Sequence, residues 1–441
     1  MRLSLPPVVV TPETGFGSKA DIFKRQPYGE RLTNLIVNSD EDLVFALDSN
    51  WGQGKSTFVR MWADYNAALE EPLETIYFDA FENDYQKDSF LAIASEVYKV
   101  IADDDSSKSD FTEKAANVFR AFGRGLLKAG VKVSTAGIID DTILDSVADD
   151  LSSTMADNVD SLLSDRFESS KQDKESLSEF KSFLEQMILE KTHNRKLVFI
   201  IDELDRCRPD FALDILEKIK HLFNIPGLTF LLVMNRDQLE ESVKCRYGSG
   251  IDAKRYLQKF INVWLSLPKQ IDGHTKSSVL FAKHAINSME CRFFNEKGFC
   301  KDTFLNLIER HATSYREIER MLTYISIVEN TSYNVLDYDR GYATAIVVTC
   351  FLKVNNPSLL KAILNKSIDG VQATEELRVS QNDDFRSLQL VAFYLSAILS
   401  DSDIAQQLQD SKLLPLGYGE DFNPMVFNEV DELLSSFTFS Y

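Results

Sequence analysis

A short glycine-containing loop at residues 49–57, with the sequence SNWGQGKST, is the first segment whose residue types suggest chemistry. Gly52 and Gly54 let the backbone turn sharply, so that successive amides can point at one anion. Lys55 would place a positive charge between the β- and γ-phosphates of a nucleotide, and the Ser56 hydroxyl would bind Mg²⁺. We therefore expect ATP with Mg²⁺ to bind here. The predicted binding residues are Trp51, Gly52, Gln53, Gly54, Lys55, Ser56 and Thr57.

The loop departs from the usual phosphate-loop pattern at its first position. Ser49 stands six residues before Lys55, where that pattern begins with glycine. Serine fits this turn if its φ is negative. The alternative interpretation is a glycine-rich turn before an ordinary helix, and the combination of two glycines, a lysine and a serine favours the phosphate loop.

A second candidate element follows the apolar run LVFII at residues 197–201. Asp202 comes directly after this run and is placed to hold Mg²⁺ through its water shell. Glu203 is the natural candidate to orient or deprotonate the attacking water. The alternative is that the acidic residues here only cap the helix expected near Pro209, as Asp205 or Asp210 could do. Two carboxylates directly after five apolar residues favour the catalytic interpretation.

Polar residues also follow the next apolar run, at residues 229–234. Asn235 is predicted to touch the γ-phosphate or the attacking water from the tip of that strand. Arg206 and Arg236 lie near the same sheet edge. Either could neutralise transition-state charge, within the chain or across a subunit interface, or could form an ordinary surface salt bridge.

The elements that must position these residues alternate between short apolar strands and amphipathic helices. Strands of this kind are typical of a parallel sheet that is covered on both faces by helices, so the chain is predicted to be an α/β protein. From about residue 275 the pattern becomes almost wholly helical. The expected strands are 43–47, 75–78, 197–201 and 229–234, and the expected helices are 21–38, 56–70, 89–101 and 210–222.

The same patterns divide the chain of 441 residues into four segments. The two parts of the NTPase core are expected at residues 1–101 and 191–272. Between them, residues 102–190 form an acidic helical insert, in which apolar residues spaced four apart at 138–167 predict an amphipathic helix. Its acidic face is either solvated or docks a partner. Residues 273–441 are expected to form a C-terminal helical lid domain.

Composition limits the classes of partner. The formal net charge of −20 disfavours direct nucleic-acid binding and attachment to anionic membranes. No window of about 18 apolar residues predicts a membrane span, and residues 1–7 lack the apolar core of a signal peptide. The five cysteines and five histidines show no metal-ligand spacing. We expect a cytoplasmic protein with reduced thiols.

Two motifs together resemble those of the KAP family of P-loop NTPases. The phosphate loops of that family carry a tryptophan before the inner glycines, as WGQGKS does at residues 51–56. The acidic motif of the family reads DDLDRC with a proline two residues later, and IDELDRCRP at residues 201–209 is similar to it. YFDAFEN at 77–83 and YLQKFI at 256–261 extend the resemblance to about residues 15–100 and 195–330.

The sequence departs from the family at three positions. Glu203 and Asn235 stand where the family usually has aspartates, and Phe81 stands for a tryptophan. Members of the family often carry transmembrane helices between the two nucleotide motifs, whereas this chain has the acidic insert.

The resemblance also implies roles for residues outside the two motifs. SYREIERML at residues 314–322 is similar to the start of a lid helix, from which Arg316 would reach the γ-phosphate and report the nucleotide state. The competing interpretation is a simple charge pattern on an exposed helix. Asp21 and Arg25 match a family segment that abuts the nucleotide base.

The function implied by the resemblance is ATP hydrolysis that switches a multi-protein assembly. Prokaryotic members resemble components of mobile-element and phage-defence operons, including Qat-type systems, so operon-encoded protein partners and a homo- or hetero-oligomer are expected. The alternative is a scaffold that binds ATP with little or no turnover, and the presence of Glu203 favours hydrolysis. Nuclease activity has little support, because no second catalytic constellation is present.

Overall fold

The computed structural model describes most of the chain. The residues it describes are 2–6, 15–17, 21–39, 41, 43–86, 88–101, 108–118, 159–193, 195–271, 275–331, 340–399 and 425–436.

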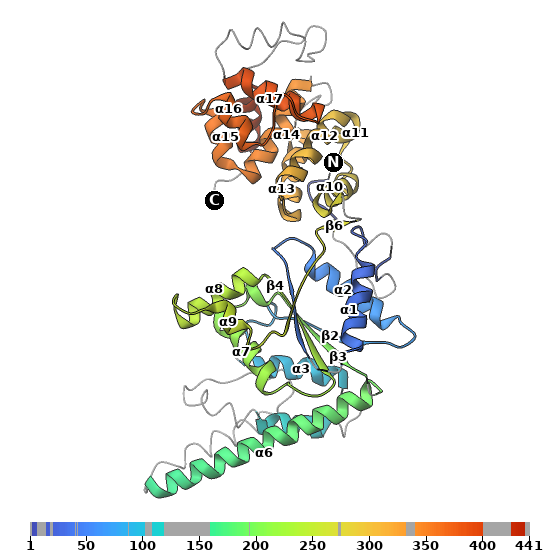
Figure 1. The fold of residues 1–441 in the computed structure, drawn as a ribbon, viewed down its shortest axis with the longest axis vertical. Coiled ribbons are helices and arrows are strands. Elements are labelled where there is room, and N and C mark those ends of the chain that lie inside the picture. The colour runs from blue at the N-terminus through green and yellow to red at the C-terminus, as the bar shows by residue number, and fades with distance from the viewer. Residues whose placement is uncertain are drawn as a thin grey trace.

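A five-stranded parallel sheet with the strand order β2-β3-β4-β1-β5 forms the centre of the first half of the fold (Figure 1). The predicted α/β class is therefore confirmed. Since all five strands run in the same direction, their carboxyl ends meet at one edge, where Asp79 pairs with Asp202 and Asp48 with Met234. The strands are β1 (Val44–Asp48), β2 (Glu74–Asp79), β3 (Leu197–Asp202), β4 (Leu228–Met234) and β5 (Val263–Ser266).

Both faces of the central strands are buried, which explains why β1, β3 and β4 are apolar except for Thr229 and the aspartates that end β1 and β3. In β3, Val198 and Ile200 face one hydrophobic core, while Phe199 and Ile201 face the other, as the two-residue period of a strand requires. The first core contains α1 (Gln26–Val37) and α2 (Lys55–Ala67). The second core contains α3 (Ser89–Ile101), α7 (Pro209–His221), α8 (Arg236–Tyr247) and α9 (Ala253–Leu257).

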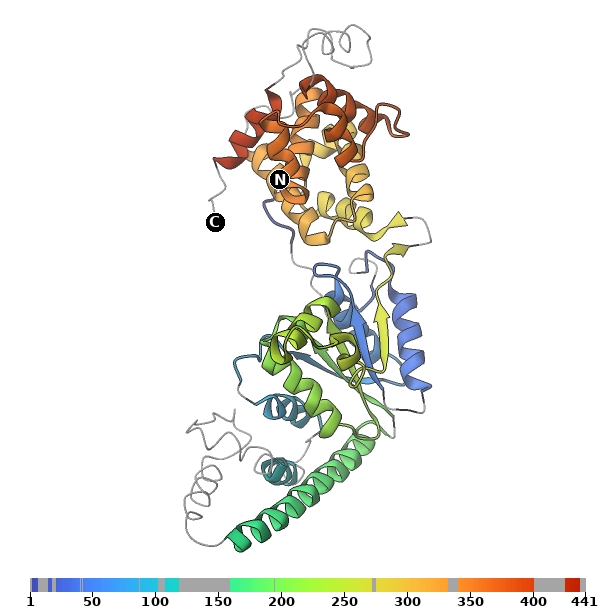
Figure 2. The same cartoon turned by 60° about the vertical axis from the view of Figure 1, so that its left-hand side comes forward.

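The described parts of the insert are helical. Residues 108–118 are helical, and α6 (Val159–Lys191) is a helix of 33 residues at the far end of the core from the C-terminal helices (Figures 1 and 2). Phe180 anchors α6, because its ring contacts those of Phe90, Phe111 and Phe223. Of the amphipathic helix expected at 138–167, residues 138–158 lie outside the described residues, and the remainder belongs to α6.

The C-terminal part is a helical domain with its own hydrophobic core. A short antiparallel pair, β6 (Gln270–Ile271) and β7 (Thr275–Lys276), lies between it and the sheet. Its helices are α10 (Ser277–Ser288), α11 (Arg292–Glu296), α12 (Gly298–Arg310), α13 (Tyr315–Thr331), α14 (Arg340–Asn355), α15 (Pro357–Leu364), α16 (Gly370–Glu376), α17 (Arg386–Leu399) and α19 (Val426–Ser435).

Residues 2–6 pack on this helical domain, far in sequence from the helices they touch (Figure 1). The Arg2 amide donates to the Met289 carbonyl (2.9 Å), and the Thr323 hydroxyl donates to the Leu3 carbonyl (3.0 Å). Residues 21–25 then lie beside α2, so the N-terminal segment contacts both halves of the molecule.

Two parts of the predicted secondary structure needed adjustment. The helix expected at 21–38 begins only at Gln26, because the Asp21 carboxylate accepts the Arg25 and Gln26 amides (2.8 and 2.9 Å) in a turn before it. The strand β5 and the helices α8 and α9 were not predicted, since β5 has only four residues and is only partly buried.

No helix among the described residues is long and apolar enough to cross a bilayer.

Candidate functional site

The glycine loop connects β1 to α2 at the carboxyl edge of the sheet. Gly52 and Gly54 have φ angles of +71° and +75°, in the left-handed region that glycine adopts without strain. Lys55 begins α2, so the open amides at the start of this 13-residue helix face the loop. The structure therefore has the strand, turn and helix that a phosphate loop requires.

Lys55 is the buried cation of this site. Its ammonium group donates to the backbone carbonyls of Ser49 and Asn50, so the side chain folds back over the loop. Burial lowers the pKa of Lys55, and the nearby carboxylates of Asp205, Asp202 and Asp48 oppose that shift. A bound polyphosphate would supply further negative charge to this ammonium group.

Asp202 lies at the end of β3 and is almost fully buried, with 1% of its surface exposed. Its Oδ2 accepts a hydrogen bond from the Tyr77 hydroxyl (2.8 Å), and its Oδ1 accepts one from the Glu203 amide (2.8 Å). Burial raises the pKa of Asp202, and these two hydrogen bonds together with the nearby Ser56 side chain act against that rise.

The two residues predicted to hold Mg²⁺, Ser56 and Asp202, line the same cavity. A hydroxyl and a carboxylate are hard oxygen donors, which suit Mg²⁺. Among the residues that the structure describes, no group of three or more His, Cys, Asp or Glu side chains could hold a metal ion. This donor set fits an ion that takes one or two protein ligands and completes its shell with phosphate oxygens and water.

Glu203 follows Asp202 in a left-handed conformation with φ of +58°, which is strained for a glutamate. Its carboxylate forms an ion pair with Arg206 at 2.6 Å. Burial raises the pKa of Glu203, while the Arg206 guanidinium lowers it. The predicted general base therefore lies at the site, paired with a cation of the same motif.

Trp51 links the loop to the acidic motif. Its indole N–H donates to the carboxylate of Asp205, which lies in the 3₁₀ turn η1 (Leu204–Arg206) after Glu203. A cavity of about 250 Å³ lies between the two motifs. It is lined by the predicted loop residues 51–57 together with Asp202, Glu203, Asp205, Arg206 and Arg316.

Asn235 lies at the carboxyl end of β4, between the strands that carry the two motifs. Its side-chain oxygen accepts the Asp237 amide (3.0 Å) and caps α8. Arg236 is bound to Glu240 (2.8 Å) and stacks on the Trp264 ring (4.5 Å). Both side chains therefore have local partners, and their catalytic roles remain predictions.

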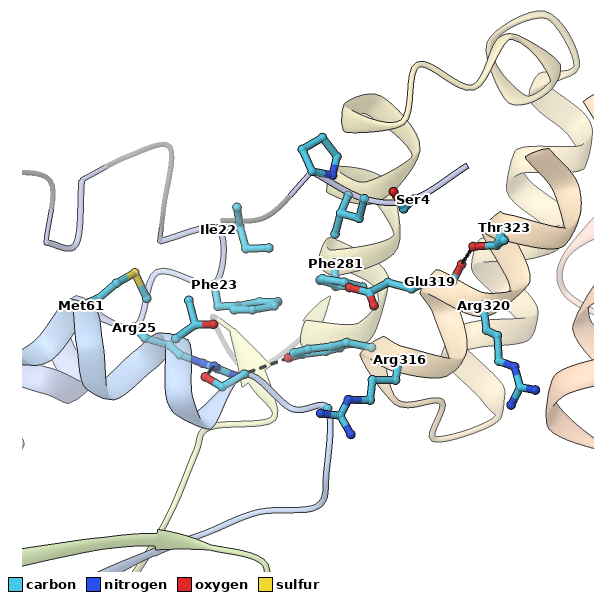
Figure 3. Close-up of a pocket in the computed structure, with 16 residues that line it drawn as sticks. Ser4, Ile22, Phe23, Arg25, Met61, Phe281, Arg316, Glu319, Arg320 and Thr323 are labelled. Atoms are coloured by element: carbon cyan, nitrogen blue, oxygen red, sulfur yellow. Dashed lines mark hydrogen bonds between the residues drawn. The ribbon is translucent and has the colours of Figure 1, made fainter. Parts of the chain in front are cut away.

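Arg316 comes from the helical domain and lies against the loop (Figure 3). The Tyr315 amide at the start of α13 donates to the Gly52 carbonyl (3.2 Å). A Cβ atom added to Gly52 would lie 2.9 Å from Cγ of Arg316. The predicted lid helix thus begins directly on the phosphate loop.

A second cavity of about 530 Å³ lies between the N-terminal segment, α2, α10 and α13 (Figure 3). The rings of Phe23, Phe281 and Tyr315 pack against one another, and the Tyr315 centroid lies 4.9 Å from that of Phe23 and 4.5 Å from that of Phe281. Arg25 is buried beside this stack and donates to the Tyr315 hydroxyl (3.3 Å) and to the Gln53 carbonyl (3.3 Å). The cavity reaches the phosphate loop, since Gly52, Gly54 and Thr57 also line it.

Sequence reasoning missed several of these residues. The aromatic wall of the larger cavity joins residues about 260 to 290 positions apart, so no local spacing reveals it. Tyr77 was noticed only as part of a family segment, and its contact with Asp202 depends on the pairing of β2 with β3. Asp205 was considered only as a helix cap.

A parallel sheet of this strand order, with a phosphate loop after one strand and a buried aspartate after another, defines a P-loop NTPase. The family model described as the KAP family P-loop domain matches residues 25–332. The chain therefore belongs to the KAP family of P-loop NTPases, and the predicted resemblance is confirmed.

Comparison with other proteins adds little beyond the family. The search of curated proteins gave no match. The solved structures that match include the ORC2 protein of Aeropyrum pernix as ADPNP–ADP complexes, with 13% identity, 98% of this chain and 87% of that chain covered, and a TM-score of 0.34. Its ADP form matches with 12% identity, 98% and 96% coverage, and a TM-score of 0.35.

Replacing Gly52 by alanine tests whether the loop conformation is needed for binding. The left-handed backbone would be strained by about 1–2 kcal/mol, and the new methyl group would press on Arg316. We expect nucleotide affinity to fall by roughly 10-fold, measured with a fluorescent nucleotide. Gly250→Ala is the matched control, because nothing lies within 4 Å of its Cβ position. Equal affinity of both variants would contradict a role for this loop.

Proposed function

We propose that this KAP-family protein is a Mg²⁺-dependent ATPase that switches a multi-protein assembly. One observation carries the proposal: a single cavity collects the phosphate loop with Lys55, the oxygen donors Ser56 and Asp202, and the carboxylate of Glu203. These are the groups needed to bind a triphosphate and to activate a water molecule.

The triphosphate would lie along the amides of residues 52–57, with Lys55 beside its β- and γ-phosphates. Ser56 and Asp202 would hold Mg²⁺, which neutralises charge on the phosphate oxygens. Glu203 would orient the attacking water and accept its proton, a task that requires the ionised carboxylate. Asn235 would assist at the γ-phosphate from the end of β4.

The larger cavity is proposed to hold the nucleoside. It adjoins the loop at Gly54 and Thr57, and Ile22, Met61 and the aromatic stack give it an apolar wall. Apolar walls with a few polar groups are usual for nucleotide bases and other small ligands. Arg25 supports this wall because it bonds both to the loop and to Tyr315.

Arg316 is proposed to transmit the state of the nucleotide to the helical domain. Its guanidinium comes from α13, whose first amide bonds to Gly52, so a change at the γ-phosphate acts on this helix directly. A ligand shifts such an equilibrium only through different contacts in the two states, and ATP and ADP differ at the γ-phosphate.

The decisive assay compares phosphate release and nucleotide binding in three proteins. Glu203→Gln should keep binding but release phosphate about 10²–10⁴-fold more slowly, because the amide accepts no proton. Lys55→Ala should lose binding, because the cation beside the phosphates is gone. Exposed Glu241→Gln and Lys254→Ala are the matched controls. If Lys55→Ala bound ATP as tightly as the wild type, the assignment of the site would be wrong.

An alternative function is an ATP-binding scaffold with little or no turnover. The observation in its favour is the ion pair of Glu203 with Arg206, which occupies the carboxylate that would activate water. Near-zero phosphate release by both the wild type and Glu203→Gln, with nucleotide still bound, would favour the scaffold over the ATPase.

The pH dependence of turnover tests whether Glu203 is the base. The Arg206 guanidinium lowers the pKa of Glu203, so its removal should raise that pKa. A general base acts in its ionised form, and the acid limb of the kcat profile should therefore move to higher pH in Arg206→Ala. Arg255→Ala, at an exposed arginine of α9, is the control. An unshifted acid limb would argue against Glu203 as the titrating group.

The assembly is proposed to be a phage-defence system, on the basis of the family resemblance alone. We expect proteins encoded next to this gene to co-purify with the wild type in the presence of ATP and less with Lys55→Ala. Recovery of the chain without partners under both conditions, together with unchanged phage resistance of cells that lack the gene, would contradict this role.

A further inference from the structure

Tyr77, in the middle of β2, has no role in the function proposed so far. Its hydroxyl lies 2.8 Å from Oδ2 of Asp202, and Nη2 of Arg60 lies 3.0 Å from the same hydroxyl. Arg60 comes from α2, and its guanidinium also lies over the Tyr77 ring, 4.9 Å from the centroid. Three elements, α2, β2 and β3, thus meet at this hydroxyl.

The direction of these hydrogen bonds is fixed by chemistry. A guanidinium group can only donate, so the Tyr77 oxygen must accept from Arg60. The single hydroxyl proton of Tyr77 is then available only for Asp202, whose ionised carboxylate can only accept. A tyrosine hydroxyl keeps its proton at neutral pH, and burial raises the pKa of Tyr77 further.

The carboxylate of Asp202 is therefore held through both of its oxygens. Tyr77 bonds to Oδ2 and the Glu203 amide bonds to Oδ1, so rotation of the carboxylate would break at least one of the two bonds. Ser56, by contrast, lines the same cavity with a hydroxyl that is itself a proposed Mg²⁺ ligand. If Mg²⁺ were bound by that hydroxyl, Tyr77 and the Glu203 amide would still orient Asp202.

We propose that Tyr77 is a positioning residue for the metal site, which orients the Asp202 carboxylate towards the water shell of Mg²⁺, with Arg60 directing its hydroxyl proton. This inference rests on the proposed function, because it presupposes that Asp202 serves a Mg²⁺–nucleotide complex. Removing a residue that hydrogen-bonds to a metal ligand typically weakens metal binding by about 10–100-fold.

A Mg²⁺ titration of Tyr77→Phe tests the proposal. The measurement is phosphate release and fluorescent-nucleotide binding at increasing Mg²⁺, with binding repeated in EDTA. We expect the half-saturating Mg²⁺ concentration to rise roughly 10-fold, while nucleotide affinity in EDTA stays unchanged. Tyr28→Phe is the matched control, since Tyr28 borders the same hydrophobic core and its buried hydroxyl has no hydrogen-bond partner among the described residues.

Arg60→Met gives an independent variant, because Arg60 is exposed and its removal leaves the core intact. It should also raise the half-saturating Mg²⁺ concentration, but only by about 3-fold, because Arg60 acts on Asp202 through Tyr77. A Tyr77→Phe protein that loses thermal stability but keeps the wild-type Mg²⁺ dependence would show a purely structural role and overturn the proposal. Unchanged Mg²⁺ dependence in both variants would do the same.

The wild-type titration separates this inference from the proposed function. If nucleotide binding and turnover by the wild type did not depend on Mg²⁺, the proposed function would be wrong, and so would the role of Tyr77. If the wild type depended on Mg²⁺ and Tyr77→Phe matched it, only the role of Tyr77 would be wrong.

Discussion

Burial of opposite charges at one edge of the sheet is the constraint on which this structure depends. Lys55 and Asp202 are both removed from water, and burial shifts the pKa of each towards its neutral form. The surrounding groups resist both shifts, with carboxylates near the lysine and hydrogen-bond donors around the aspartate. A buried charge is tolerated only with such partners, and the parallel strands bring those partners to one place.

The C-terminal helical domain contacts the phosphate loop at this same edge of the sheet. The helix α13 starts on the carbonyl of Gly52, and Arg25 bonds to both the loop and Tyr315. Glycine is required at position 52, because its backbone is left-handed and the side chain of Arg316 lies against it. The phosphate loop is therefore in contact with the helical domain as well as with the sheet.

The acidic motif contains a strained backbone residue that is held in place by its neighbours. Glu203 has a left-handed backbone that a glutamate adopts only when its surroundings impose it. Two neighbours impose it here: the Glu203 amide is held by Asp202, and the Glu203 carboxylate is held by Arg206. Trp51, characteristic of the family, bonds to Asp205 and connects this strained turn to the phosphate loop. The two motifs recognised separately in the sequence thus form one bonded unit.

The sequence by itself determined the local chemistry and the fold class. The strands β1, β3 and β4 and the helices α2, α3 and α7 were predicted to within a few residues, because all-apolar strands and glycine turns are local signals. The loop residues, Asp202 and Glu203 were predicted as site residues from the same kind of local signal. Only the tertiary structure decided which distant groups meet: Tyr77 with Asp202, Arg316 with Gly52, and Phe23 with Tyr315 and Phe281. Strand order and domain packing set those contacts, and neither leaves a periodic pattern in the sequence.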